Sequence, residues 1–250
     1  MPKNTEHFDL KYMDEFKEVL KNYRPSDESL RILRQLTYAI LVAPTAGGRN
    51  TIINELTKTG NYHYIVSDTT RPPKYRDGKM EEDGVNYFFR EEKEVLDDLK
   101  DGAFLEAAII HNQQVSGQSI REFKKALEQN KVAISEIEIV GAHNVMDFKP
   151  DTLCIFVLPP NFEEWQRRIK GREVMSEVEL RRRLASALKE FDMALKHDYY
   201  HFVINDTLTQ AAEDINNIVR TGDKDMERQQ HGRALAEQLY IATKAYLGKS

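Results

Sequence analysis

Around Gly47 and Gly48 the sequence reads YAILVAPTAGGRNT, an apolar run followed by a turn of small residues, a cation and an amide. This order is close to the phosphate-binding loop GxxxxGK[ST], whose backbone N–H groups surround phosphates while its lysine reaches the β- and γ-phosphates and its hydroxyl binds Mg²⁺. Ala43, Arg49 and Asn50 replace the first glycine, the lysine and the hydroxyl residue. The segment predicts contact with a polyphosphate, although two glycines in a strand–turn–helix are common by themselves.

The surrounding elements alternate between strand-like and helical patterns. Short apolar runs recur between amphipathic segments, which predicts βαβ units and a mainly parallel sheet flanked by helices. The candidate strands are Tyr38–Val42, Tyr64–Val66, Phe104–Ile110, Val132–Ile139, Leu153–Leu158 and His201–Ile204. The candidate helices are Asn50–Thr59, Glu92–Asp101, Ser119–Gln129, Phe162–Lys170, Ser176–Lys196 and Leu208–Arg220.

Further blocks follow the loop in a fixed order. They read SDTTRPPKYRDGKMEEDGVNYFF from Ser67, FLEA from Phe104, EIEIVG from Glu136, FVLPP from Phe156, GREVMSEVELRRRL from Gly171 and VINDTL from Val203. In residue type, order and spacing these blocks resemble the guanylate kinases across about Tyr38–Arg220. The resemblance implies an α/β P-loop nucleoside monophosphate kinase fold, with a monophosphate-binding arm at about 67–118 and a helical lid at about 171–184.

Two segments lie outside this resemblance. Residues 1–37 predict a helical N-terminal extension that is interrupted near Pro25, and residues 221–250 predict a helical C-terminal extension. The family-like domain between them is expected to cover residues 38–220. Both extensions are expected to pack against the core or against a second subunit, so a homodimer is compatible with the sequence.

The resemblance implies a donor site at the loop. Arg49 keeps the charge of the usual lysine but presents a bulkier, planar fork. The side-chain oxygen of Asn50 is a candidate Mg²⁺ ligand, because Mg²⁺ prefers oxygen donors. The implied donor-nucleotide residues are Ala46, Gly47, Gly48, Arg49, Asn50, Thr51 and Asn205.

The implied catalytic set consists of Arg49 and two lid arginines, Arg172 and Arg183. In the family such cations close over the transferring phosphoryl group, and the charge spread over its oxygens requires them. Arg181 and Arg182 are expected on a solvated helix face instead.

The acceptor site is implied by the arm. Guanine offers donors at N1 and N2, so an ionised carboxylate reads it, and Glu106 aligns with the family's glutamate; adenine presents an acceptor at N1 instead. One tyrosine of the family's phosphate site is replaced by Ser116, and Ala107 replaces a tryptophan. The implied acceptor residues are Ser67, Arg71, Lys74, Tyr87, Glu106, Ser116, Gln118 and Glu136.

The leading hypothesis is therefore an ATP-dependent phosphotransferase that phosphorylates GMP or dGMP with Mg²⁺. The alternative is a non-catalytic guanylate-kinase-like module that recognises a nucleotide or a phosphorylated peptide. Retention of Arg49, both lid arginines and Glu106 favours the enzyme. A kinase that acts on a different monophosphate also stays open at this point.

Composition narrows the partners. A formal net charge of -5 argues against general affinity for nucleic acid or anionic membranes. The lone cysteine, Cys154, excludes a disulfide within the chain, and no metal-ligand spacing is present. No apolar run reaches the length of a membrane span and the first residues lack a signal-peptide core, so we expect nucleotides as partners and the cytoplasm as location.

Overall fold

The computed structural model describes residues 10–76, 78–172, 175–222 and 225–248, without the side chains of Arg76 and Arg172. The chain forms two compact units. The first, which we call the arm unit, comprises Met1–Leu36, Tyr64–Ala133 and Asp147–Pro150. The second, the core unit, comprises Thr37–His63, Ile134–Met146 and Asp151–Ser250.

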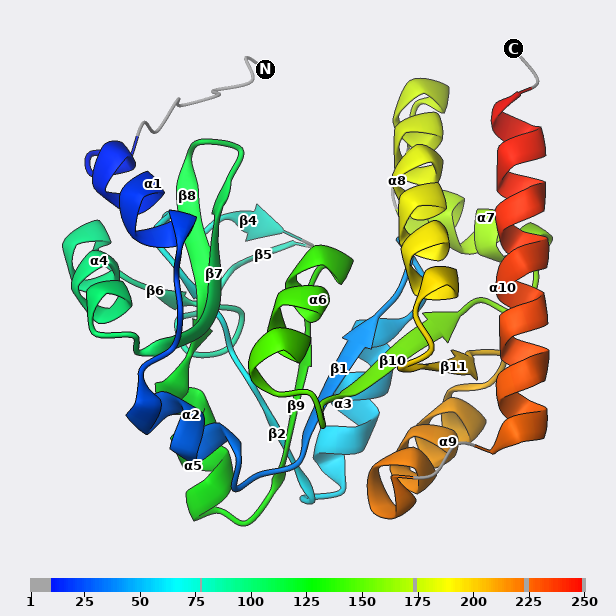
Figure 1. Cartoon of the computed structure of the whole chain (residues 1–250). Helices are drawn as coiled ribbons and strands as arrows, with labels where there is room; N and C mark the ends of the chain where they lie inside the picture. Colours follow the sequence, from blue (N-terminus) through cyan, green and yellow to red (C-terminus); the bar gives the residue numbers. More distant parts are fainter. Residues whose placement is uncertain (1–9, 77, 173–174, 223–224, 249–250) are drawn as a thin grey trace. The chain divides into compact units, whose positions relative to one another are not determined.

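A five-stranded sheet of order β11-β10-β1-β9-β2 is the framework of the core unit (Figure 1). Its central strands are continuous buried apolar runs, as expected for a parallel sheet covered on both faces. Strand β10 pairs in parallel with β1 and with β11, which confirms the predicted mainly parallel sheet. The strands are β1 Tyr38–Val42, β2 Tyr62–Tyr64, β9 Val132–Glu136, β10 Leu153–Leu158 and β11 Tyr200–Ile204.

Helices accompany these strands. They are α3 Arg49–Lys58, α6 Ile139–Phe148, α7 Phe162–Arg172, α8 Glu177–Lys196, α9 Leu208–Thr221 and α10 Met226–Leu247. Ser176 caps α8 by accepting from the backbone N–H of Glu179. The C-terminal extension forms α10, which runs beside α8 in Figure 1 and also contacts β11. A Cβ placed on Gly232 of α10 would lie 2.6 Å from Phe202 Cβ, so a glycine permits this close approach.

The arm unit is built on a smaller sheet of order β6-β3-β8-β7. Its long antiparallel pair, β7 with β8, is extended by the two-residue strands β3 and β6. Strands β4 and β5 pair with each other in a separate two-stranded sheet. The strands are β3 Asp68–Thr69, β4 Tyr75–Arg76, β5 Lys79–Met80, β6 Phe88–Phe89, β7 Phe104–Ile110 and β8 Gln114–Ser119. The helices are α1 Met13–Lys21, α2 Asp27–Leu33, α4 Glu92–Lys100 and α5 Ile120–Glu128.

The expected strand Val132–Ile139 is wrong in its second half. Strand β9 ends at Glu136, and the N–H of Ala142 donates to the carbonyl of Glu138 (3.1 Å) as α6 begins. The alternating residues EIEIV therefore divide between a strand end and a helix start. In the part of the chain that is described, every helix is too short or too polar to span a lipid bilayer.

Candidate active site

The glycine-rich loop leaves β1 and enters α3 in the core unit. Ala46 and Gly48 both adopt left-handed backbone angles, with φ of 59° and 102°. Gly48 is the N-cap of α3, and a Cβ there would lie 2.1 Å from Asn205 Nδ2, so only glycine fits. The turn directs backbone N–H groups at the start of a helix, which is a favourable place for an anion.

Two side chains hold the glycine-rich loop in place through hydrogen bonds to its carbonyl groups. The amide of Asn205 donates from Nδ2 to the carbonyl of Gly47 (2.9 Å), and its backbone N–H donates to Leu158 (2.7 Å). The indole of Trp165, which is fully buried, donates to the carbonyl of Thr45 (2.7 Å). Sequence reasoning expected Asn205 beside the donor base and missed Trp165. A lone tryptophan whose indole N–H needs an acceptor was the available signal.

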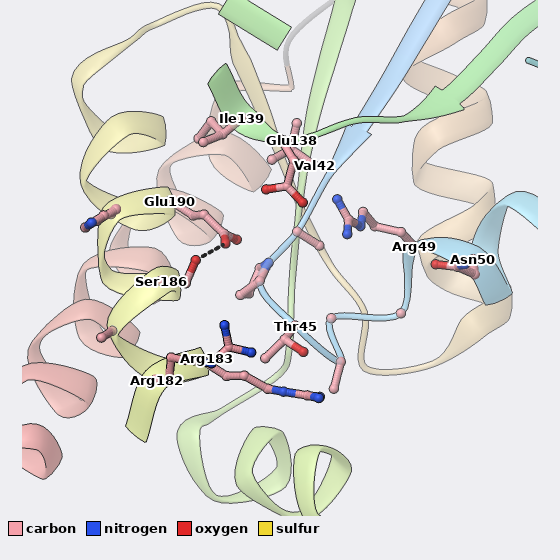
Figure 2. A pocket seen from close by; sticks show the side chains of 17 residues that line it. Val42, Thr45, Arg49, Asn50, Glu138, Ile139, Arg182, Arg183, Ser186 and Glu190 are labelled. Atoms are coloured by element: carbon pink, nitrogen blue, oxygen red, sulfur yellow. Dashed lines mark hydrogen bonds between the residues drawn. The ribbon is translucent and has the colours of Figure 1, made fainter. Parts of the chain in front are cut away.

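A cavity of about 650 Å³ opens beside the loop (Figure 2). Its volume lies in the usual range of small-molecule sites. The loop and the start of α3 form one wall, and a face of α8 forms another. The lining residues are Val42, Ala43, Pro44, Thr45, Ala46, Gly47, Gly48, Arg49, Asn50, Glu138, Ile139, Arg182, Arg183, Ala185, Ser186, Lys189 and Glu190.

Arg49 and Asn50 converge on Glu136 at the edge of this cavity. Arg49 Nε lies 3.5 Å from Glu136 Oε2, and Asn50 Nδ2 donates to Glu136 Oε1 at 3.1 Å. Arg49 Nη1 also donates to the carbonyl of Ile137 (3.4 Å). Glu136, which the sequence assigned to the acceptor, thus contacts the donor loop. Thr51 is exposed on α3 and does not line the cavity.

Glu190 is a cavity carboxylate that sequence reasoning missed. Burial and the negative charge of Glu138 together raise the pKa of Glu190 to about 7, although the positive charge of Arg49 opposes them. Ser186 Oγ lies 3.4 Å from Glu190 Oε1, one helical turn earlier on α8. Figure 2 shows Arg49, Glu138 and Glu190 directed into the same space. The signal was the helical spacing of Arg183, Ser186 and Glu190 on one face.

Of the two predicted lid arginines, only Arg183 has a side chain that the structure describes. Arg172 ends α7, and its side chain lies outside the described residues. Arg183 lines the cavity and pairs through Nε with Glu179 Oε1 (2.8 Å). Arg182 shares the same carboxylate, with 73% of its side chain exposed. The expectation that Arg181 is solvated was wrong, because its Nη2 donates to the carbonyl of Leu247 (2.5 Å) at the end of α10.

The residues that the sequence assigns to the acceptor phosphate, Arg71, Lys74, Tyr87 and Ser116, lie in the arm unit. Arg71 is buried and donates both Nη atoms to Glu81, at 2.5 and 3.0 Å. Its guanidinium also lies 4.9 Å from the ring centroid of Tyr87. The backbone N–H of Lys74 donates to the same Glu81 carboxylate (2.9 Å), while the Lys74 side chain is on the exposed surface. Glu81 therefore sets the orientation of the arginine within this loop.

Glu106 and Gln118 face each other across β7 and β8. Burial raises the pKa of Glu106 to about 7, although a hydrogen bond from the Gln118 backbone N–H opposes the rise. A Cβ on the neighbouring Gly117 would lie 2.4 Å from the Glu106 carbonyl, so the strands approach closely here. Ser116 shares a 2.8 Å hydrogen bond with Thr69. A carboxylate in such a site matches the paired donors of a guanine edge.

The half-buried Ser67 precedes β3 in the same unit. Its carbonyl accepts from the backbone N–H of Phe88 (2.9 Å), which ties it to the segment that carries Tyr87. Arg71, Tyr87, Ser67, Ser116, Glu106 and Gln118 thus all belong to the arm unit.

The fit of the core unit to a divalent cation depends on Asn50. Because Asn50 Nδ2 donates to Glu136, the side-chain oxygen of the same amide is the atom available to a cation. Within the described ranges no group of three or more His, Cys, Asp or Glu residues is arranged to hold a metal. Mg²⁺ in phosphoryl-transfer sites is commonly held by one or two protein oxygens, substrate phosphates and water, so this donor set fits it.

Comparisons with known proteins agree with this geometry. A family model described as guanylate kinase matches residues 35–222. The guanylate kinase of Clostridioides difficile (strain 630) is 33% identical over 190 residues, covering 76% of this chain and 89% of that protein. Guanylate kinase 1 of Oryza sativa subsp. japonica is 30% identical over 187 residues, and the match covers 74% of this chain and about half (48%) of the rice protein. The crystal structure of guanylate kinase from Anaplasma phagocytophilum matches with a TM-score of 0.55 at 25% identity, covering 82% of this chain and 96% of that chain.

Proposed function

Because the chain belongs to the guanylate kinase family, we propose that it transfers the γ-phosphoryl group of ATP to GMP or dGMP in the presence of Mg²⁺. The observation that carries this proposal is that one chain holds both a cation-lined phosphate loop and a carboxylate suited to guanine. The products are ADP and GDP or dGDP.

The core unit binds the donor in this proposal. Backbone N–H groups of the loop surround the β- and γ-phosphates, and Arg49 adds a guanidinium at the start of α3. The side-chain oxygen of Asn50 would hold Mg²⁺, which would supply positive charge that offsets the charge of the phosphates. Asn205 and Trp165 act indirectly, because they fix the carbonyl positions of the loop.

The arm unit binds the acceptor. The ionised Glu106 accepts from N1 and N2 of guanine, and Ser67 and Gln118 complete the base site. Arg71, whose direction is set by Glu81, binds the monophosphate together with Tyr87, Lys74 and Ser116. An arginine fork suits this phosphate because it can donate two parallel hydrogen bonds.

The chemical step is a direct in-line transfer. A phosphate oxygen of GMP forms a bond to the γ-phosphorus while the bond from that phosphorus to the β-bridging oxygen breaks, and ADP leaves with that oxygen. The attacking oxygen is already ionised, so no protein base is required. Arg183 and Arg172 neutralise the charge on the transferring group, which is the main contribution that a protein makes in this reaction.

An ADP-release assay with ATP–Mg²⁺ and a panel of nucleoside monophosphates tests the acceptor. We expect GMP or dGMP to give the highest kcat/KM. The Glu106 carboxylate accepts hydrogen bonds from the N1 and N2 donors of guanine, whereas adenine presents an acceptor at N1 that cannot pair with it. AMP or UMP as the best substrate would contradict the guanine assignment. The phosphopeptide-binding alternative is supported by no feature of the described residues, and binding of ATP–Mg²⁺ in a calorimetric titration would weigh against it.

We also propose the boundaries of the catalytic domain, its location in the cell and its partners. Residues 38–220 form the catalytic domain, and residues 1–37 and 221–250 are extensions to it. The cytoplasm supplies the nucleotide substrates, and neither nucleic acid nor a membrane is needed as a partner. A homodimer is compatible with activity, and light scattering of the full chain measures it.

A further inference from the structure

Residues of the N-terminal extension form hydrogen bonds with the strand that carries Glu106 and with Gly102, which precedes that strand. The hydroxyl of Tyr23, between α1 and α2, donates to the carbonyl of Phe104 (2.8 Å) and accepts from the backbone N–H of Phe104 (2.9 Å). Close by, the carbonyl of Gly102 accepts from Ser29 Oγ (2.8 Å) and from the backbone N–H of Ser26 (3.0 Å). Tyr23, Ser26 and Ser29 lie outside residues 35–222, which match the family model, whereas Gly102 and Phe104 lie within them.

The position of these hydrogen bonds matters because β7 is an edge strand, which among the described residues pairs with another strand on one side only. Its register against β8 shifts between Phe104 and Glu106, which is the irregularity expected of a β-bulge. Phe104 itself is fully buried, so water cannot replace a partner for its backbone groups. One phenol oxygen serves both the N–H and the carbonyl at the point where the strand bends.

Tyr23 is suited to this role by its surroundings. It packs against an apolar cluster of Leu10, Phe16, Val95, Leu96, Leu99, Phe104 and Val115. Burial raises the pKa of Tyr23 far above its usual value, and the nearby charge of Glu106 adds to the rise. The phenol therefore remains a neutral donor and acceptor throughout the physiological pH range.

On the other side of the strand, the backbone of β7 at Glu106 packs closely against Gly117 of β8. A Cβ on Gly117 would lie 2.4 Å from the Glu106 carbonyl and 2.6 Å from Ala107 Cβ. The backbone around Glu106 is thus held by close packing against β8 and by Tyr23 at the bulge.

We propose that the N-terminal extension is a specificity element of the acceptor site, in which Tyr23 fixes the bulge at Phe104 and thereby positions the Glu106 carboxylate against guanine. This inference rests on the proposed function. Tyr23 is a positioning residue, since it acts through the backbone of β7 and touches no substrate. The extension would serve recognition of the base, while the donor residues belong to the core unit.

The test is Tyr23→Phe in the full chain, which removes the hydroxyl and keeps the ring. We expect KM for GMP to rise at least about threefold, because each intramolecular hydrogen bond is worth about three- to tenfold and the substitution removes two. KM for ATP should stay within about twofold of the wild type. The preference for GMP over IMP should fall as well. IMP lacks the 2-amino group, so a displaced Glu106 loses the contact that separates the two nucleotides.

Tyr12→Phe is the matched control. Tyr12 belongs to the same extension and packs on the same cluster, but its contact with Glu92 is made by its backbone N–H (3.2 Å). Both kinetic constants and the GMP/IMP ratio should stay at wild-type values. Ser29→Ala provides a second variant that removes one of the two donors to Gly102, and it should shift KM for GMP in the same direction by a smaller factor.

Thermal unfolding of each variant separates positioning from stability. A Tyr23→Phe protein with a lower Tm but wild-type KM for GMP and an unchanged GMP/IMP ratio would overturn this inference alone. Absence of GMP phosphorylation by the wild-type chain would overturn the proposed function and this inference together. A rise in KM for both GMP and ATP would also contradict it, because the effect would then not be confined to the acceptor.

Discussion

At the scale of single residues, Arg49 is the point at which this chain departs furthest from the usual phosphate loop. Its Nε faces Glu136 and its Nη1 donates to the carbonyl of Ile137, so the site uses two separate nitrogens. A lysine has one nitrogen and cannot reach both. We therefore expect Arg49→Lys to be less active than the wild type, although it restores the common motif.

Arg49→Ala should lower kcat by about 10²- to 10³-fold, the range for removing one stabilising group from a charged transition state. Calorimetric binding of GMP should change little, because the residues assigned to its base and phosphate, apart from Glu136, lie in the arm unit. Steady-state kinetics of both variants check this. A lysine variant as fast as the wild type would mean that the loop merely tolerates an arginine.

Glu106 predicts a pH dependence of acceptor binding. Since burial raises its pKa to about 7, the free protein holds it mostly protonated at pH 6 and mostly ionised at pH 8. Guanine binds the ionised form, so the affinity for GMP should increase between these values. Calorimetry with GMP alone excludes Glu190, whose pKa is also raised to about 7 and which lines the donor cavity. The phosphate of GMP also titrates, at about pH 6, so the same titration on Glu106→Gln isolates the part due to Glu106.

The carboxyl group of Glu106 also makes protein stability depend on pH, in the opposite direction: stability falls as pH rises, whereas the affinity for GMP increases. A folded-state pKa above the unfolded value of 4.5 means that its favourable contribution is complete below pH 4.5 and is lost as pH rises through about 7. Glu106→Gln should therefore raise Tm relative to the wild type at pH 8 and change it little at pH 5. Equal Tm differences at both pH values would show that Glu106 does not titrate as described.

Arg183 should act mainly in the transition state. We expect Arg183→Ala to lower kcat more than it raises either KM, because the charge that it faces develops during transfer. Arg167→Ala is the control, since Arg167 is 75% exposed and pairs with Glu164 on α7 away from the cavity lining. A variant with normal kcat and weaker binding alone would remove Arg183 from the catalytic set.

At the scale of elements, the close contact of α10 with β11 gives a test in which two effects oppose each other. Alanine favours a helix over glycine by about 1 kcal/mol, but a Cβ on Gly232 would lie 2.6 Å from Phe202 Cβ. Overpacking of this kind costs about 1–3 kcal/mol, so Gly232→Ala should lower the free energy of unfolding.

Gly171→Ala is the matched control, because a Cβ there has no neighbour within 4 Å among the described residues. This substitution should be neutral or slightly stabilising. Urea unfolding of both variants measures the difference. If Gly232→Ala were as stable as Gly171→Ala, α10 would not be packed against β11 as described.

Elements with strong local patterns were predictable from the sequence. Strands β1 and β10 and helix α8 agree with the predicted ranges, because long apolar runs and a long amphipathic helix are visible in the local sequence. Strand β8 was missed since its sequence, QVSGQS, is polar and holds the glycine that the close approach of β7 requires. The two-residue strands of the arm are too short to show a period.

At the scale of the whole molecule, the ordered sequence blocks were sufficient to assign the family. Three residues of the candidate site and its surroundings, in contrast, act through contacts between distant segments of the chain. Trp165 reaches Thr45, Glu190 faces Arg49, and Tyr23 reaches Phe104. No local pattern records such pairs, so the sequence alone could not place them. The charge balance was informative in a simpler way, since a net charge of -5 left local cationic clusters as the candidates for anion binding.

The most direct measurement of the central claim follows the γ-phosphoryl group itself. The full chain is incubated with γ-labelled ATP, GMP and Mg²⁺, and the nucleotides are separated. The account predicts that label appears in GDP in equal amount to the ADP formed, and that chelation of Mg²⁺ abolishes the transfer. Label released only as inorganic phosphate, or ATP left intact with GMP bound, would contradict it.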